Sequence, residues 1–279
     1  MTSLPDSTTP SSAEPAFGLI IIGDEILSGK RADKHLPRVV DLLKARGLQL
    51  AYADYVGDSP PRITATLKRA FASGDIVFSC GGIGATPDDH TRRCAARALG
   101  LDLVLHPQAE ALIRERMQDM AREQGVAYEP DRSDNIHRLN MGMFPRGAQI
   151  VPNPFNKIAG FSHGSVHFLP GFPVMAWPMI EWVLDTHYAH LRRSEVWIEK
   201  SVIVFGSMEA TLTPLMEQIE RKHSGVKVFS LPSVDHPQYG RHIELGVKGE
   251  PALVEQAYQG LIRGLKDFNV KLGPELVQQ

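Results

Sequence analysis

Residues 81–91 read Gly81-Gly82-Ile83-Gly84-Ala85-Thr86-Pro87-Asp88-Asp89-His90-Thr91, between an apolar run at 75–80 and a helical pattern at 92–99. The apolar run predicts a buried strand. Glycines directly after such a strand let the backbone turn tightly before a helix starts. Residues 75–99 therefore predict one strand–loop–helix unit of an α/β protein.

Two similar units come before it. Residues 17–22 are almost wholly apolar and residues 48–56 read as a second strand, and each is followed by a helix with one apolar stripe. Three strands separated by helices predict a mostly parallel, doubly wound sheet. Further along, we expect a helix at 107–124, a loop at 128–140, strands at 148–151 and 166–169, and a helix that starts at Pro173.

The chain divides into three parts by pattern. Residues 1–15 are rich in Ser, Thr and Pro and predict a disordered leader. Residues 16–193 predict the α/β domain. Residues 194–279 read as strand, helix, strand, strand, helix, which is typical of a small α+β domain.

The composition excludes several classes of protein. Hydrophobic residues make up 43% and charged residues 22% of the 279 residues, with a formal net charge of -2. These values rule out a mostly disordered or fibrous chain and give no bulk electrostatic reason to expect nucleic acid. No apolar run approaches the roughly 18 residues of a membrane span. Because the leader lacks the features of a secretion signal, a cytoplasmic location is expected.

Acidic side chains follow all three predicted strands. Asp24 and Glu25 follow the first strand, Asp58 follows the second, and Asp88 and Asp89 lie in the loop after the third. Ligands of parallel sheets bind outside the carboxyl ends of the strands, where these acids meet. The glycines present backbone N–H groups to an anion, and the following helix adds its positive end.

A phosphate beside carboxylates needs a divalent cation between them, and Mg²⁺ is commonly held by one or two carboxylates plus phosphate oxygens. The pattern therefore indicates a phosphate-handling site. The alternative is a tight turn with no ligand. A dinucleotide fingerprint is excluded, because Pro87 stands where its third glycine is needed.

The 81–91 loop closely resembles the GGLGPTxDDxT signature of the competence/damage-inducible protein A (CinA) family, and more distantly the GGTGxxxxDxT loop of molybdopterin-binding proteins of molybdenum cofactor biosynthesis. Four further segments resemble motifs of the family, namely Gly23 to Gly29 (GDELLxG), Val56 to Asp58 (VGD), Phe168 to Pro173 (xLPGVP) and Phe205 to Glu209 (FGxxE). The resemblance covers about residues 16–270. We expect the C-terminal nicotinamide-nucleotide deamidase domain of many relatives to be absent.

The resemblance implies a molybdopterin-binding type of α/β domain that takes a small phosphorylated ligand, a pterin or a nucleotide diphosphate. It implies that Asp58 and Asp89 are catalytic and hold the divalent metal. It assigns the ligand to the matching positions Asp24, Glu25, Ser28, Gly29, Gly81, Gly82, Gly84, Thr86, Asp88, Thr91, Asn153, Pro170 and Gly171. Related folds self-associate, so a homo-oligomer is expected by analogy. No nucleic-acid or membrane partner is expected.

Three functions follow from this resemblance. The first is metal-dependent hydrolysis of a nucleotide diphosphate such as ADP-ribose. The alternative is molybdopterin binding in molybdenum cofactor biosynthesis, with or without adenylyl transfer. The third is a binding or assembly module that has lost turnover, which the departure of residues 153–161 from the NPxGTAPGF pattern favours. Ala85 also replaces a proline of the signature, which should loosen the loop without removing its N–H donors.

Overall fold

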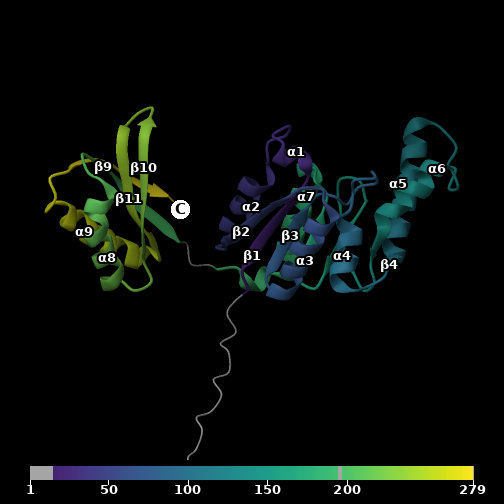
Figure 1. The fold of residues 1–279 in the computed structure, drawn as a ribbon, viewed down its shortest axis with the longest axis horizontal. Coiled ribbons are helices and arrows are strands. Elements are labelled where there is room, and N and C mark those ends of the chain that lie inside the picture. Colours follow the sequence, from purple (N-terminus) through teal and green to yellow (C-terminus); the bar gives the residue numbers. More distant parts are fainter. Residues whose placement is uncertain (1–14, 194–196, 279) are drawn as a thin grey trace, which may run out of the picture. The chain divides into compact units, whose positions relative to one another are not determined.

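The computed structural model describes residues 15–193 and 197–278, and the chain divides into two compact units between Arg192 and Arg193 (Figure 1). The leader expected at residues 1–15 lies, except for Pro15, outside the described residues. Residues 194–196, where the sequence places the start of the second domain, lie outside them too. Each unit has its own sheet.

The first unit is built on a six-stranded sheet in the order β2-β1-β3-β8-β7-β6. Strands β2, β1, β3 and β8 run parallel, whereas β7 pairs antiparallel with β8 and β6 antiparallel with β7. The strands are β1 (Phe17–Ile22), β2 (Leu50–Val56), β3 (Ile76–Cys80), β6 (Gln149–Val151), β7 (Gly160–His163) and β8 (Val166–Leu169). The predicted mostly parallel α/β sheet is confirmed.

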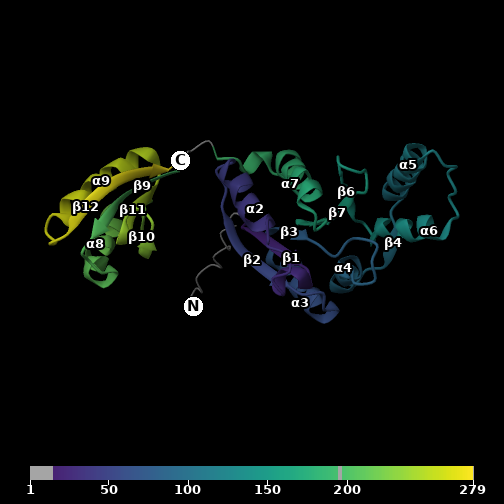
Figure 2. The same ribbon diagram turned by 90° about the horizontal axis from the view of Figure 1, so that it is seen from above.

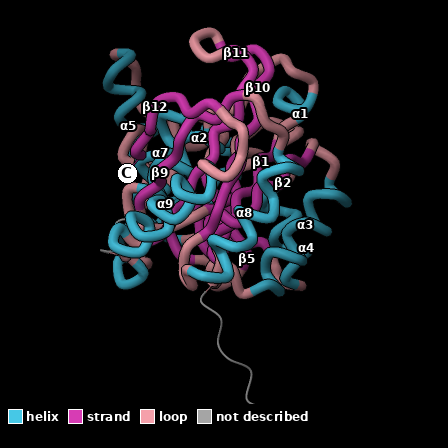
Figure 3. Tube along the Cα trace, turned by 90° about the vertical axis from the view of Figure 1, so that its left-hand side faces the viewer, coloured by secondary structure: helices cyan, strands magenta, loops and turns pink. Residues whose placement is uncertain are grey.

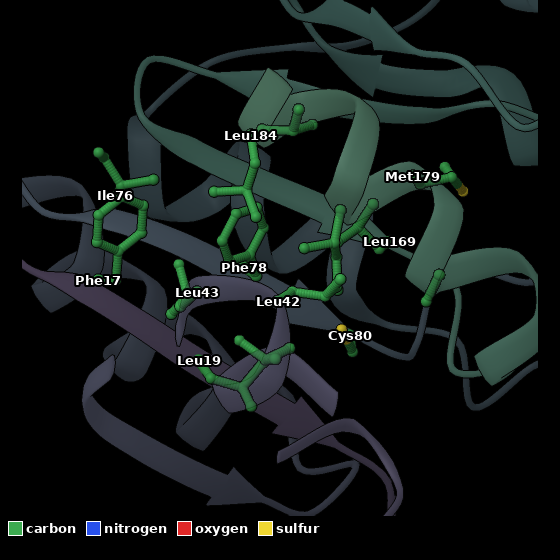
Figure 4. Packing of buried hydrophobic residues seen from close by; sticks show 14 of the residues in the cluster. Phe17, Leu19, Leu42, Leu43, Ile76, Phe78, Cys80, Leu169, Met179 and Leu184 are labelled. Atoms are coloured by element: carbon green, nitrogen blue, oxygen red, sulfur yellow. The ribbon is translucent and has the colours of Figure 1, made fainter. Parts of the chain in front are cut away.

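Helices cover both faces of this sheet (Figure 2). Helices α2 (His35–Lys44) and α7 (Pro173–His187) pack on one face, and α3 (Pro60–Ser73) and α4 (Thr91–Leu99) on the other. The first face buries Leu19, Phe78 and Leu43 in one apolar cluster (Figure 4). Burial of both faces explains why β1 and β3 are continuous apolar runs rather than alternating ones.

Local sequence signals set the ends of these helices. Both carboxylate oxygens of Asp33 accept backbone N–H groups at the start of α2, from His35 at 2.8 Å and Leu36 at 3.0 Å. Helix α3 begins with Pro60, whose missing N–H costs nothing in the first turn, and ends at Gly74 in the left-handed conformation. The short helix α1 (Asp24–Leu27) follows β1 directly.

A helical segment adjoins the sheet on the α4 side. It contains β4 (Leu103–Leu105) paired with β5 (Met143–Pro145), together with α5 (Pro107–Gln124) and α6 (Ser133–Leu139). The loop expected at 128–140 is therefore wrong at residues 133–139. Helix α6 has only seven residues and no apolar stripe, so sequence periodicity could not reveal it. The Asn135 side chain, which donates to the Glu129 carbonyl at 2.7 Å, ties the helix to the preceding turn.

The second unit is an antiparallel sheet with strand order β10-β11-β9-β12 (Figure 3). Its elements are β9 (Ile198–Phe205), α8 (Glu209–Lys222), β10 (Lys227–His236), β11 (Gly240–Gly249), α9 (Pro251–Leu265) and β12 (Lys271–Gln278). The sequence did not predict β12, because Gly273-Pro274 reads as a turn. The sheet accommodates these two residues because β12 is an edge strand whose register shifts between Leu272 and Glu275.

Two short 3₁₀ turns, Asn140–Gly142 and Ala189–Leu191, complete the described elements. Among the helices that the structure describes, none combines the length and the apolar character required to cross a bilayer.

Candidate functional site

The candidate site lies at the carboxyl ends of β2, β1, β3 and β8, which are neighbours in the sheet. The loops that leave these four strands carry almost all of the predicted site residues. Strands β3 and β8 are joined here by the Gly81 N–H, which donates to the Leu169 carbonyl at 2.9 Å. The β3 and β8 loops are therefore fixed to each other where they leave the sheet.

The first residues of the β3 loop need to be glycine. A Cβ atom on Gly81 would lie 2.2 Å from the carbonyl oxygen of Ile22, and a Cβ atom on Gly82 would lie 2.2 Å from Oγ1 of Thr91. Both glycines have positive φ, 110° and 67°. The hydroxyl of buried Thr91 donates to the Gly81 carbonyl at 3.0 Å, and the Thr91 N–H donates to the Gly82 carbonyl at 3.0 Å. Thr91 thus holds the turn against the start of α4.

The Asp89 carboxylate accepts hydrogen bonds from two other residues of this loop. One carboxylate oxygen accepts the Gly84 N–H at 2.8 Å, and the other accepts the Thr86 N–H at 2.8 Å and the Thr86 hydroxyl at 2.5 Å. The two amides that the sequence offers to an anion at Gly84 and Thr86 are therefore bound to the protein's own carboxylate. The role of Asp89 in the structure is to shape the loop.

Arg92, which the sequence did not indicate as a site residue, binds two carbonyl groups of the same loop. It is 7% exposed, and its guanidinium group donates to the carbonyl of Ile83 and, at 2.6 Å, to that of Gly84. Burial lowers the pKa of Arg92 to about 10, so that the side chain stays charged at neutral pH. No sequence signal separates Arg92 from the exposed Arg93, because only the tertiary structure shows which of the two points inward.

Asp24 and Asp58 join the ends of β1 and β2 in a reciprocal pair. The Asp24 N–H donates to the Asp58 carboxylate at 2.8 Å, and the Asp58 N–H donates to the Asp24 carboxylate at 3.1 Å. The predicted acids after the first two strands are therefore brought together.

The pKa of Asp58 reports on its surroundings. Partial burial is the main factor that raises the pKa of Asp58 above its usual range, and the amide of Asp24 opposes this effect. The nearby charges of Asp24, Glu25 and Asp88 raise the pKa further. Three further acidic side chains therefore lie near enough to Asp58 for their charges to act on it.

This cluster makes a pH-dependent contribution to stability. The pKa of Asp58 is raised in the folded state, so the folded state holds the proton more tightly than the unfolded state does. Stability is therefore lost as the pH rises through the folded pKa and Asp58 ionises. We therefore expect Asp58→Asn to raise the free energy of unfolding slightly at neutral pH. At about pH 3 the Asp58 carboxyl group is protonated and as uncharged as the asparagine amide, so the free energy of unfolding should not change. Urea denaturation at the two pH values measures this. A loss of stability at neutral pH would contradict it.

The other predicted residues lie around the same strand ends. Ser28 ends helix α1, and Gly29 follows it with φ 74°. Glu25 lies 4.0 Å from Arg31 across an exposed ion pair. Gly171 follows Pro170 after β8, and a Cβ atom on it would lie 3.5 Å from the Cα atom of Gly81.

Asn153 has a structural environment of its own. It is 5% exposed, its amide donates to Asn156 and to the Ile158 carbonyl, and its oxygen accepts the Phe155 N–H. All of these bonds stay within residues 153–158. Lys157 in this segment has φ 64°, and its ammonium group is held at 2.6 Å by both Glu115 and Asp119 of α5.

His35 is a second residue that sequence reasoning missed. It is 5% exposed, and its Nε2 atom lies 3.0 Å from the Gly171 carbonyl. Since a carbonyl only accepts, Nε2 carries the hydrogen and the buried Nδ1 is left without a partner in the described structure. His35 therefore fixes the β8 loop from helix α2.

The described residues contain no group of three or more His, Cys, Asp or Glu side chains arranged to hold a metal ion. The Asp58 cluster supplies carboxylates of the kind that Mg²⁺ prefers. Asp89, predicted as the second metal ligand, uses both oxygens within its own loop.

Comparisons with known proteins agree with this architecture. A CinA-like protein of Geobacter metallireducens is 30% identical over 221 residues, which are 75% of this chain and 50% of that protein. A protein of Pyrobaculum aerophilum is 29% identical over 262 residues, which are 89% of this chain and 93% of that protein. The crystal structure of a CinA protein of unknown function from Thermoplasma acidophilum has a TM-score of 0.51 at 26% identity and covers 61% of this chain and 96% of its own.

The chain spans about half the length of the Geobacter relative. Residues 18–190 match the family described as a probable molybdopterin binding domain. This range includes every loop of the candidate site. The chain therefore belongs to the family of probable molybdopterin binding domains, in a CinA-like form.

Proposed function

We propose that the first unit binds a phosphorylated pterin of the molybdopterin type, with the phosphate on the β3 loop. The observation that carries the proposal is the construction of this loop. Asp89, Thr91 and Arg92 hold it in one conformation. Within the described part of the chain, the amides of Gly82 and Ala85 donate to no protein acceptor, and both residues are accessible to solvent.

Charge supports the same placement. Helix α4 starts at Thr91, directly after the loop, so that its positive end lies beside these amides. The acids at the ends of β1 and β2 repel a phosphate. A phosphate is therefore favoured at the amides of Gly82 and Ala85 and disfavoured near Asp58, where the charges of Asp24, Glu25 and Asp88 add to the repulsion.

The test is anaerobic equilibrium binding of molybdopterin, for which saturable binding is expected. Asp89→Asn should weaken this binding about tenfold, because an amide offers only one accepting oxygen and turns an NH₂ group toward a loop N–H, at a cost of about 1.5 kcal/mol. Asp102→Asn is the matched control, since its side chain is 78% exposed and lies outside the loop. Equal affinity of both variants, or no binding by the unaltered chain, would refute the proposal. Addition of ATP tests for adenylyl transfer.

A second candidate function is hydrolysis of a nucleotide diphosphate such as ADP-ribose. The observation that favours it is the convergence of acids on Asp58, whose mutual repulsion a divalent cation would relieve. Asp58 and Asp24 would hold this ion, which would neutralise the charge that develops on the phosphate oxygens.

Incubation with ADP-ribose and Mg²⁺, Mn²⁺ or Co²⁺ separates the two functions. A hydrolase would release AMP and ribose 5-phosphate, and Asp58→Asn would lower the rate by about 100-fold or more while Asp102→Asn left it unchanged. Binding of the nucleotide without any product would exclude hydrolysis and leave ligand binding as the function.

A further inference from the structure

The loop that leaves β8, the strand next to β3, carries an exposed aromatic side chain, Phe172. The first unit contains eight phenylalanines, and six of them, Phe17, Phe71, Phe78, Phe144, Phe161 and Phe168, pack against other rings. The other two, Phe155 and Phe172, are exposed. Phe172 is 54% exposed, and in the described structure its ring contacts no other aromatic side chain.

The position of Phe172 is fixed by the backbone around it. It follows Gly171, on which a Cβ atom would lie 3.5 Å from the Cα atom of Gly81 and whose carbonyl is held by His35. Pro173 comes next and restricts Phe172 to extended backbone, observed at φ -89° and ψ 120°. The Phe172 carbonyl also accepts the N–H groups of Met175 and Ala176. These contacts hold the backbone that carries the ring in place beside the β3 loop.

The charge distribution indicates on which side of the phosphate the rest of a ligand lies. Strand order places β1 and β2, with Asp24 and Asp58, on one side of β3 and places β8 on the other. Since Asp24 and Asp58 repel an anionic ligand on the β1 side, the rest of the ligand is favoured on the β8 side of the β3 loop. Neighbouring strands lie about 4.8 Å apart, so Phe172 is within roughly 5–10 Å of the loop, the reach of a phosphate joined to a ring by a few bonds.

We propose that Phe172 is the stacking surface for a planar nitrogen heterocycle, the pterin or purine of the phosphorylated ligand. This proposal rests on the proposed function, because it takes the phosphate to be on the β3 loop. Aromatic side chains bind the faces of such rings, and their removal weakens binding measurably.

The test compares Phe172→Ala, Phe172→Leu and Phe172→Tyr in binding to molybdopterin and to ADP-ribose, which carry a pterin and an adenine respectively. Phe172→Ala and Phe172→Leu should each weaken binding of the preferred probe about tenfold. Leucine keeps apolar area but has no ring face, whereas Phe172→Tyr should retain full affinity. The decrease in ultraviolet absorbance that stacking causes should disappear in the leucine variant.

Phe155→Ala is the matched control. Phe155 is also exposed, at 60%, but it follows β6, two strands further from the loop. Full affinity of Phe172→Leu, or an equal loss in Phe155→Ala, would overturn the assignment while leaving the proposed function intact. If the unaltered chain binds neither probe, the proposed function fails and the stacking surface fails with it. The probe that shows the larger Phe172 effect identifies the ring as pterin or purine.

Discussion

Gly81→Ala is expected to lower the free energy of unfolding of the first unit by about 3 kcal/mol or more, the largest effect of any single substitution in the site. Two costs add together. The new Cβ atom would lie 2.2 Å from the Ile22 carbonyl oxygen, which belongs to a buried strand and cannot move aside alone. The backbone at φ 110° is also unfavourable for an L-residue.

Gly29→Ala separates these two costs. Gly29 has φ 74°, and no atom lies within 4 Å of the position of its Cβ, so that only the backbone cost of about 1 kcal/mol remains. Urea denaturation of both variants measures the difference. Similar stabilities of the two variants would show that the close approach of Gly81 to Ile22 adds no cost to the substitution. Binding of molybdopterin by Gly81→Ala would show that the ligand does not need this turn.

Arg92→Met is expected to lower the free energy of unfolding by about 2–3 kcal/mol and to abolish ligand binding. The substitution leaves the carbonyls of Ile83 and Gly84 without their charged donor, and hydrogen bonds to charged groups contribute about 1.5–3 kcal/mol each. Relief of the buried charge offsets part of the loss, as the lowered pKa of Arg92 indicates.

Arg93→Met provides the control within the same turn of α4. Arg93 is exposed, so its loss should change stability by less than about 0.5 kcal/mol. Arg92→Lys should be intermediate, because one ammonium group keeps the charge but cannot match the planar fork of a guanidinium group. Hydrogen exchange of the loop amides would report the change directly. Equal protection in Arg92→Met and Arg93→Met would contradict the supporting role of Arg92.

These variants address one property of the site, a loop held rigid by side chains that lie on either side of it. Thr91 and Arg92 come from the first turn of α4, Asp89 from the loop itself, and Gly81 is tied to β8. A pre-organised loop loses little conformational freedom when a ligand binds. The same rigidity extends to the β8 loop through His35 and Gly171.

The sequence alone determined the class of the fold and predicted that the candidate site residues lie at the carboxyl ends of the strands. Apolar runs such as 17–22 and 75–80 read as strands because both faces of a parallel sheet are buried, and that burial leaves a continuous pattern. The loops that carry the acids and glycines could be placed at the strand ends, because glycine, proline and aspartate have strong preferences for turns. Helix α6 and strand β12 have no such periodic pattern, and the sequence did not reveal them.

Only the tertiary structure decided what each site residue does. Asp58 and Asp89 look equivalent in the sequence, yet Asp58 lies among converging acids whereas Asp89 binds the amides of its own loop. Arg92 and His35 were invisible as site residues, because their partners, the carbonyls of Gly84 and Gly171, are backbone atoms that no residue pattern encodes. Periodicity reports which side of an element is buried, while the direction of a single polar side chain depends on atoms that only the folded chain brings near it.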